Sequence, residues 1–229
     1  MAIVTVDFDG TLYQGNSFKI MFQMGKKNFG VKEWIVVFTG IAKALAVGVV
    51  RGKAALRLQF FRAFAKTFNG KTKEELDVFF QQLVNIGKKD FNHDLIHKLR
   101  EHQEKGDTVI ILSGALQPFL EAFTKEVQLD VHVISTELQL NEQGLCTGDV
   151  GEIINGEEKV RKVQEWVKRS GRGSTEIWAY ADSESDIPLF HYVKYPIVVN
   201  PDSDMKKIAH KNKWPIFAAE KNRGSTHFI

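Results

Sequence analysis

The fold is decided by the stretch Ile3-Val4-Thr5-Val6-Asp7-Phe8-Asp9-Gly10-Thr11. Its first four residues are all branched at Cβ, which predicts a short, buried strand. Acidic residues follow at once and end that strand. A strand that runs directly into two carboxylates indicates a polar site at its carboxyl end.

The part of the chain that follows has the spacing of helices. Between Ser17 and about Gly87 there is no proline, and large apolar residues recur at steps of three or four. This spacing places apolar side chains on one face of a helix, and glycines separate the segments. The stretch therefore predicts a bundle of about four helices.

Beyond the bundle, strands alternate with helices. The expected strands cover Thr108–Leu112, Val131–Ser135, Glu176–Ala181 and Ile197–Asn200, and a hairpin joins Leu138–Leu140 to Leu145–Thr147. Alternation of this kind is typical of a parallel sheet with helices on both faces.

The predicted fold class is α/β, a Rossmann-like parallel sheet with an inserted α-helical bundle. The helical stretch is far too long for a crossover connection, so it is expected to form a cap domain over residues 14–89. Residues 1–13 and 90–229 form the core. The polar tail from Glu220 to Ile229 is expected to be loosely held.

Composition and charge narrow the class of protein. Apolar residues make up 43% and charged residues 26% of the chain, which favours a soluble globular protein over a disordered or fibrous one. A single cysteine, Cys146, excludes an internal disulfide framework and fits a reducing compartment, so a cytoplasmic location is expected. Residues 1–70 carry ten basic and three acidic residues, a net charge of +7, whereas the remainder carries −4. The basic segment favours an anionic partner.

One segment is an alternative to the soluble interpretation. Trp34–Val50 has only Lys43 as a charged residue and is near the shortest length, about 17 residues, that spans a bilayer. A central lysine costs about 2.5–3.5 kcal/mol there. A helix buried among other helices is therefore the preferred interpretation, and no stable membrane insertion is expected.

Polar residues close four of the expected strands. They are Asp7 with Asp9, Ser113, Asp182 and Asn200. The carboxyl ends of parallel strands meet at one edge of the sheet, where Lys159, near the start of a helix, also belongs. Two carboxylates about 4 Å apart repel by about 4 kcal/mol at an effective dielectric near 20, so the cluster needs a cation. Oxygen ligands with open positions favour Mg²⁺, which leaves room for a phosphate oxygen.

Each of these residues has a plainer explanation when taken singly, since aspartates and serines are common in turns and helix caps. Their order and spacing together are much harder to obtain by chance. His93, His97 and His102 have no carboxylate motif beside them and are expected to be surface histidines.

The motifs Asp7-Phe-Asp-Gly-Thr11, Ile110-Ile-Leu-Ser113-Gly, Gly156-Glu-Glu-Lys159 and Tyr180-Ala-Asp182-Ser-Glu-Ser-Asp186 resemble those of the haloacid dehalogenase superfamily. The resemblance covers nearly the whole chain and is to the phosphoserine-phosphatase-like branch, which has a helical cap after the first strand. It implies that Asp7 is the nucleophile and that Asp9 is the general acid and base. Ser113, Gly114 and Lys159 would hold the phosphoryl group. Mg²⁺ would be bound by Asp7, the Asp9 backbone carbonyl and Asp182, with Asp186 in support.

The resemblance also bears on the substrate. An acid at Asp9 fits a phosphatase, because an ester oxygen needs protonation and a halide does not. Thr11, Asn16 and Arg57 are expected to contact the substrate together with Gly114. Asn16 stands where phosphoserine phosphatase has a glutamate that pairs with the substrate amine, which argues against phosphoserine.

The sequence thus predicts a Mg²⁺-dependent phosphatase that acts on a small phosphorylated metabolite through an aspartyl phosphate. The many cap phenylalanines leave a lipophilic phosphate as a minor alternative. Two rival functions stay open: a phospho-acceptor signalling domain, and a non-catalytic basic module that binds membrane or nucleic acid. The first should lack the large insert and the second acid, both of which are present, and the overall charge of +3 gives no reason to expect nucleic-acid binding.

Overall fold

The core of the molecule is a six-stranded parallel sheet with the strand order β3-β2-β1-β6-β7-β8. The computed structural model describes residues 1–46, 52–171 and 176–218. The strands are β1 (Ile3–Val6), β2 (Thr108–Leu116), β3 (His132–Thr136), β6 (Ile177–Ala181), β7 (Tyr195–Val199) and β8 (Ile216–Phe217). All four residues of β1 are buried, because β2 and β6 pair with it on both sides and helical layers cover both faces of the sheet.

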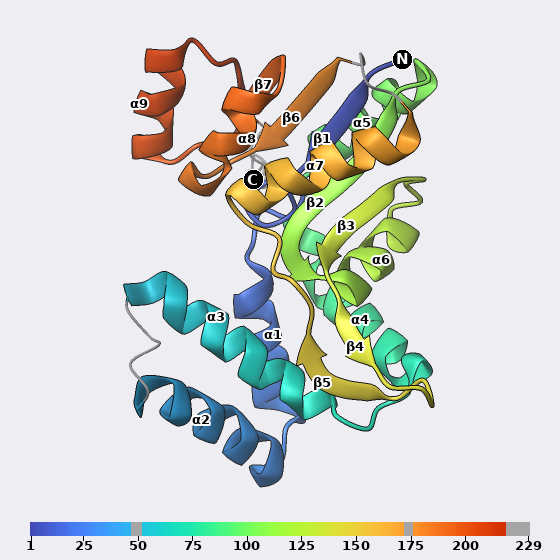
Figure 1. The fold of residues 1–229 in the computed structure, drawn as a ribbon, viewed down its shortest axis with the longest axis vertical. Coiled ribbons are helices and arrows are strands. Elements are labelled where there is room, and N and C mark those ends of the chain that lie inside the picture. Colours follow the sequence, from blue (N-terminus) through green and yellow to red (C-terminus); the bar gives the residue numbers. More distant parts are fainter. Residues whose placement is uncertain (47–51, 172–175, 219–229) are drawn as a thin grey trace, which may run out of the picture.

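Helices cover both faces of this sheet (Figure 1). Alternate residues of β1 belong to different clusters: Val4 and Val6 face one layer and Ile3 faces the other, as the pleat of a strand requires. The first layer contains α5 (His93–Glu104) and α6 (Gln117–Glu126), and the second contains α7 (Glu157–Ser170), α8 (Ile187–Tyr192) and α9 (Ser203–Asn212). The α/β prediction is confirmed.

Four helices follow β1, as the apolar spacing predicts, before α5 leads back into the sheet. They are α1 (Ser17–Asn28), α2 (Val31–Ala46), α3 (Gly52–Ala65) and α4 (Lys73–Gly87), with a short 3-10 turn at Lys66–Phe68. Asn16 caps α1, and Thr72 forms a capping box with Glu75 at α4, so local chemistry fixes where both helices begin.

The hairpin of β4 (Leu138–Leu140) and β5 (Cys146–Val150) lies among the cap helices rather than beside the sheet (Figure 1). The Gly70 amide donates to the Cys146 carbonyl at 2.7 Å, and the Cys146 amide donates to the Lys71 carbonyl at 2.8 Å. Gly148 approaches Lys66 so closely that a Cβ would lie 2.9 Å from the Lys66 Cα. The hairpin itself was predicted, but its packing against the cap was not.

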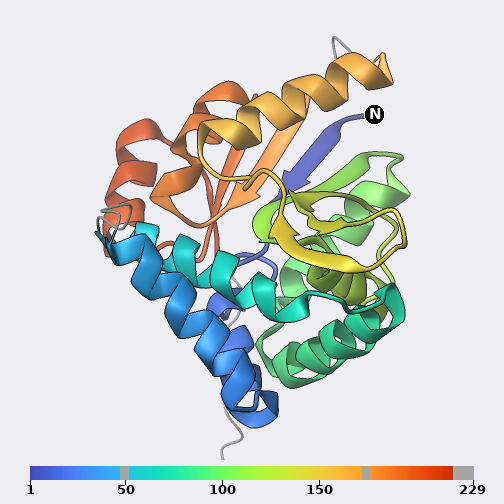
Figure 2. The same ribbon diagram turned by 60° about the horizontal axis from the view of Figure 1, so that its bottom comes forward.

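Helix α4 is attached to the core through contacts with α6. Gln81 of α4 donates to Glu126 of α6 at 3.3 Å, and Lys88 pairs with the same carboxylate at 2.7 Å. Phe80 of α4 stacks on Phe119 of α6 with ring centroids 6.5 Å apart. By contrast, α2 runs along α3 at the edge of the molecule in both ribbon views (Figure 2).

Three details differ from the sequence-based expectations. Strand β2 continues past Ser113 to Leu116 through a shift in its register with β3. Strand β8 was not predicted, because its two residues are too few to show a pattern. His102 is buried rather than on the surface, and its ring nitrogens contact Asp107 at 2.9 Å and the Tyr180 hydroxyl at 3.0 Å. The other two histidines, His93 and His97, are exposed as expected.

The apolar run Trp34–Val50 contributes its first 13 residues to α2, and Val47–Val50 lie outside the described residues. The expectation of a helix buried among other helices is wrong, because α2 packs on α3 by one face only and Ile35 and Phe38 on another face are 55% and 61% exposed. Within the described part of the chain, a search for helices long and apolar enough to cross a membrane finds none. The tail from Glu220 to Ile229 also lies outside the described residues.

Candidate active site

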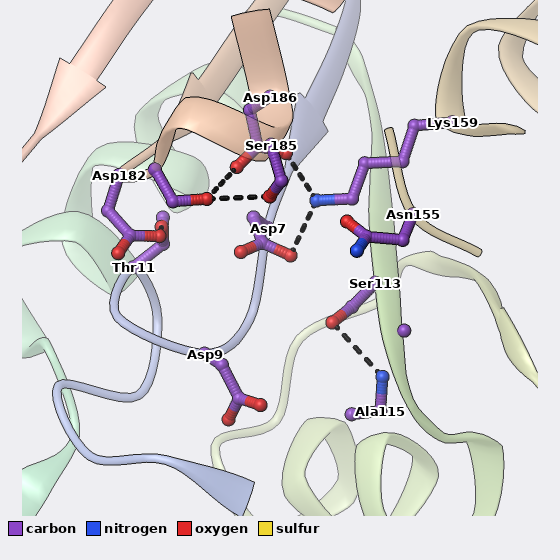
Figure 3. A network of polar contacts seen from close by, with 12 residues as sticks. Asp7, Asp9, Thr11, Ser113, Ala115, Asn155, Lys159, Asp182, Ser185 and Asp186 are labelled. Atoms are coloured by element: carbon purple, nitrogen blue, oxygen red, sulfur yellow. Dashed lines mark hydrogen bonds and ion pairs between the residues drawn. The ribbon is translucent and has the colours of Figure 1, made fainter. Parts of the chain in front are cut away.

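Side chains from four separate parts of the chain converge at the carboxyl edge of the sheet (Figure 3). Asp7 follows β1, Asp182 follows β6, Ser113 lies in β2, and Lys159 lies in the first turn of α7. Carboxylate oxygens of Asp7, Asp182 and Asp186 all lie within 4.8 Å of one another. The structure therefore brings together the residues that the strand ends predicted, apart from Asn200.

Lys159 is the cation at the centre of this cluster. Its side chain is 3% exposed, and its ammonium lies 2.9 Å from Asp7 Oδ1 and 2.5 Å from Asp186 Oδ1. Burial alone would lower the pKa of Lys159, but Asp186 and Asp7 outweigh that effect and raise it. The ammonium is thus charged at neutral pH and balances part of the negative charge.

The pKa values of Asp7 and Asp182 in the cluster are raised, which shows that one ammonium does not balance all of the negative charge. Burial raises the pKa of Asp7, and Lys159 offsets only part of that shift. Burial also raises the pKa of Asp182 to about 7, with Asp7 and Asp186 adding to the effect and the Thr11 hydroxyl opposing it. One ammonium does not neutralise three carboxylates, so the site has room for a further positive charge.

The donor set fits a hard divalent cation. Every ligand atom offered by the three aspartates is an oxygen, which suits Mg²⁺. Asp182 is held in place by the Thr11 hydroxyl at 3.1 Å. Gly10, which has a φ of +79°, passes so close that a Cβ would lie 2.1 Å from the Asp182 carboxylate, so only glycine fits there.

Thr11 does not contact the cavity, contrary to the expectation that it binds substrate. Its side chain is fully buried and donates to Asp182, while its backbone carbonyl accepts from the side-chain amide of Asn92 at 3.0 Å. Thr11 lies behind the acidic cluster and orients one member of it. The correction follows from the loop geometry after β1, which turns Thr11 inward.

Asp9 points away from the other three carboxylates (Figure 3). Ser17, the first residue of α1, donates to Asp9 from its amide at 2.7 Å and from its hydroxyl at 2.5 Å. Burial raises the pKa of Asp9 to about 7, although both bonds from Ser17 act against the increase. The carboxyl group is thus held apart from the cluster by the start of the cap.

Ser113 and Gly114 also line the cavity. The Ser113 Oγ is 3.3 Å from the Ala115 amide, and the Thr136 hydroxyl donates to the Gly114 carbonyl at 2.9 Å. A Cβ on Gly114 would lie 3.3 Å from the Ile154 carbonyl, so a larger residue would narrow the wall. The bonds to Ala115 and Thr136 fix the local backbone.

These groups line one side of a cavity of about 760 Å³, which holds Asp7, Asp9, Ser113, Lys159 and Asp182 among its lining residues. Apolar cap residues from α1 and α3 also line this cavity, together with Ile153. The cap residues are Phe18, Leu58 and Phe61.

The expected substrate contacts in the cap have different outcomes. Asn16 does line the cavity, although its side-chain oxygen also accepts from the Lys19 amide at 3.2 Å as the helix cap. Arg57 falls within α3, but its side chain lies outside the described residues.

Several lining residues were missed by the sequence analysis. Ser17 and Asn155 belong to this group, as do Ser183 and Ser185. The Ser183 hydroxyl donates to Asp186 at 2.8 Å. A signal existed for the last two, since they alternate with the acidic residues between Asp182 and Asp186. No comparable pattern in the sequence marked Asn155, which directly precedes Gly156 at the start of α7.

Comparison with known proteins gives a consistent family match. The family model for haloacid dehalogenase-like hydrolases matches residues 4–191. A histidinol-phosphatase of Neisseria meningitidis is 27% identical over 124 residues, which cover 52% of this chain and 54% of that protein. A phosphoserine phosphatase of Mycobacterium tuberculosis is 26% identical over 144 residues, covering 59% and 46%. The chain thus spans about half the length of these curated relatives.

Solved structures show the same fold. A protein of unknown function from Bordetella pertussis Tohama I has a TM-score of 0.76 and 20% identity, covering 94% of this chain and 97% of that one. A phosphoserine phosphatase described as a phospho-aspartyl intermediate analogue has a TM-score of 0.57 and 19% identity, with coverage of 96% and 93%.

Proposed function

The chain belongs to the haloacid dehalogenase-like hydrolase family, and on that premise we propose that it hydrolyses a small phosphomonoester with Asp7 as the nucleophile. The observation that carries the proposal is the position of the Asp7 carboxylate, at the cavity wall and 2.9 Å from a buried ammonium. Within this proposal, residues 1–13 and 90–229 are the catalytic core and residues 14–89 are the cap. The named phosphatases among the relatives support the reaction class.

In the first step, an Asp7 oxygen attacks phosphorus and the bond from phosphorus to the alcohol oxygen breaks. Asp9 donates a proton to that oxygen, so the alcohol leaves neutral and Asp7 carries the phosphoryl group. In the second step, Asp9 takes a proton from water, the water oxygen attacks phosphorus, and the Asp7–phosphorus bond breaks. Asp9 suits this role because Ser17 holds it apart from the acidic cluster.

The phosphoryl oxygens are held by groups on both sides of Asp7. Lys159 supplies positive charge, and Ser113 with the Gly114 amide supplies hydrogen-bond donors. Asp186 accepts from Lys159 at 2.5 Å and so positions the ammonium rather than the phosphoryl group.

Asp7, Asp182 and the Asp9 backbone carbonyl are proposed to hold Mg²⁺. When bound, the ion neutralises charge on the phosphoryl oxygens and removes their repulsion from the carboxylates. Thr11 and Gly10 keep Asp182 directed at that position.

The proposal is tested by measuring phosphate release from an aryl phosphate with and without Mg²⁺. Wild type should be active only with the metal, and Asp7→Asn should lose at least about a thousandfold in rate. Asp9→Asn should still release aryl alcohol in the first turnover, because that leaving group needs little protonation, but its phosphate release should also fall strongly, because the second step needs Asp9 as the base. Asp204→Asn, an exposed aspartate in α9, is the matched control. Undiminished activity in Asp7→Asn would exclude the mechanism.

A further inference from the structure

Half of the large apolar side chains exposed in the described part of the chain lie on α2. Four of them, Val31, Ile35, Phe38 and Leu45, are 77%, 55%, 61% and 54% exposed. Together with exposed Ala42, they follow one another at steps of four and three residues, so they share one face of the helix. We refer to these five residues as the α2 stripe.

The α2 stripe is a second apolar face of the helix, separate from the face that packs against α3. The opposite side of α2 already has a partner, because Val37 is fully buried and a Cβ on Gly40 would lie 2.9 Å from the Ala63 Cβ of α3. A helix that has one packed face and a second apolar face is missing a partner for the second. The stripe therefore points to something outside the described chain.

The charges beside the stripe indicate the chemistry of that partner. Lys32 and Lys43 are exposed and lie along one border of the stripe, 11 residues and three turns apart. Glu33, the acidic residue of α2, is only partly exposed. In an antiparallel pair with a second copy of this helix, the lysines of both copies would lie on the same side and repel, whereas anionic lipid headgroups complement the basic border.

An aromatic path joins the stripe to the cavity. Ring centroids are 5.5 Å apart from Phe38 to Trp34, 5.6 Å from Trp34 to Phe22, 5.7 Å from Phe22 to Phe60 and 4.4 Å from Phe60 to Phe18. Phe18 lines the cavity together with Leu58 and Phe61. The cavity thus has a polar end at Asp7 and an apolar end at Phe18, and packed rings connect Phe18 to the stripe.

We propose that the α2 stripe docks on the surface of an anionic lipid bilayer, and that the cavity takes from that surface a phosphomonoester with a long apolar chain. The docking stands on the stripe and its basic border. The substrate class rests on the proposed function, since it places the phosphate at Asp7 and the chain along the aromatic path.

Docking is tested by flotation of the full chain with phosphatidylcholine vesicles, with and without phosphatidylserine. Wild type should float with the anionic vesicles. Phe38→Glu should reduce the bound fraction at least about tenfold, because it places a carboxylate in the stripe. Lys32→Gln combined with Lys43→Gln should reduce binding to the anionic vesicles by roughly thirtyfold.

Val78→Glu is the matched control, because Val78 is also 61% exposed but lies on α4. It should bind as wild type does. Docking is overturned if wild type binds neither vesicle, or if Val78→Glu weakens binding as much as Phe38→Glu. A dimer in solution that Phe38→Glu separates, without vesicle binding, would replace the bilayer by a second copy.

The substrate class is tested with phosphatidate in the same vesicles. Ile35→Glu, which changes the α2 stripe outside the aromatic path, should hydrolyse a water-soluble aryl phosphate as fast as wild type, while its hydrolysis of phosphatidate falls in proportion to vesicle binding. Wild type that hydrolyses the aryl phosphate and binds vesicles but leaves phosphatidate intact would overturn the substrate class. Vesicle binding without hydrolysis of either compound would refute the proposed function and leave the docking in place.

Discussion

The carboxyl edge of the sheet and the outer face of α2 depart from the usual division of residues in opposite ways. At the sheet edge, Asp7, Lys159 and Asp186 are charged and buried. On α2, Ile35 and Phe38 are apolar and exposed. Burial of charge and exposure of large apolar groups both cost free energy, so each arrangement indicates a binding partner outside the chain. The first arrangement suits a cation and a phosphate group, and the second suits an apolar surface.

The largest effect is expected from removing the buried cation. Lys159→Met leaves Asp7 and Asp186 without their shared partner, which should lower the free energy of unfolding by about 3 kcal/mol and the rate of phosphate release at least about a hundredfold. Urea unfolding and an aryl phosphate assay measure the two effects. Lys168→Met, at an exposed position of the same helix, should change stability by about 0.5 kcal/mol or less. A stable, active Lys159→Met would show that the buried charges are not coupled.

Two phenylalanines of the cap, Phe64 and Phe38, allow a buried and an exposed apolar side chain to be compared. Phe64 is fully buried among Phe29, Phe60 and Phe68, so Phe64→Ala should lower the free energy of unfolding by about 3–5 kcal/mol. Phe38→Ala should lower it by only about 0.5 kcal/mol, because that ring is already mostly in water. Urea unfolding at one pH measures both values. Equal losses would mean that the stripe is packed in the free protein.

A third region shows that buried polar groups also occur away from the site. Tyr180→Phe removes the hydroxyl that contacts His102 and should lower the free energy of unfolding by about 1–3 kcal/mol without changing the rate of hydrolysis. A change in rate equal to that of Lys159→Met would connect this network to the reaction.

The same network predicts a dependence on pH. Burial acts to raise the pKa of Asp107, but bonds from His102 and the Ala2 amide outweigh it and hold the pKa below its ordinary value. The stability from Asp107 is thus complete above that ordinary value, about 4, and is lost as the pH falls through the lowered one. Asp107→Asn should lack this acid-dependent loss in thermal unfolding measured across pH. An unchanged profile would contradict the assignment.

The smallest effect is expected at the edge of the site. Ser17→Ala removes one of the two bonds that hold Asp9, and should slow hydrolysis of an alkyl phosphate about tenfold. The first step on an aryl phosphate, measured as the burst of aryl alcohol, should slow less than the first step on the alkyl phosphate, because an aryl leaving group depends less on a proton donor. Ser170→Ala, on the exposed end of α7, is the control. Equal slowing of the first step on the two substrates would show that Ser17 does not affect proton donation by Asp9.

Much of the core could be predicted because its signals are local. The β-branched run before Asp7 marks the central strand, and the glycines and polar residues at strand ends mark the cluster. The burial of His102 was not predicted, although its spacing from Leu95 and Leu99 places it on the same buried face of the helix.

Other features could not be predicted, because they depend on contacts between distant segments. The hairpin packs on the cap through Gly148 and Cys146, whose neighbours Lys66 and Lys71 are far away in sequence. The position of Thr11 likewise depends on its hydrogen bond to Asp182, which lies 171 residues later in the sequence. Pattern and spacing identify which residues are polar or apolar, but not which distant segment each one meets.

The central claim is that Asp7 carries the phosphoryl group, and rapid quenching of Asp9→Asn with an aryl phosphate tests it most directly. The aryl group leaves with little need for a proton, whereas hydrolysis of the intermediate needs Asp9 as a base, so the intermediate should accumulate. Mass spectrometry of the peptide that contains Asp7 should then show one phosphoryl group on Asp7, together with a burst of aryl alcohol. Turnover with the phosphoryl group on another residue, or on none, would contradict the account.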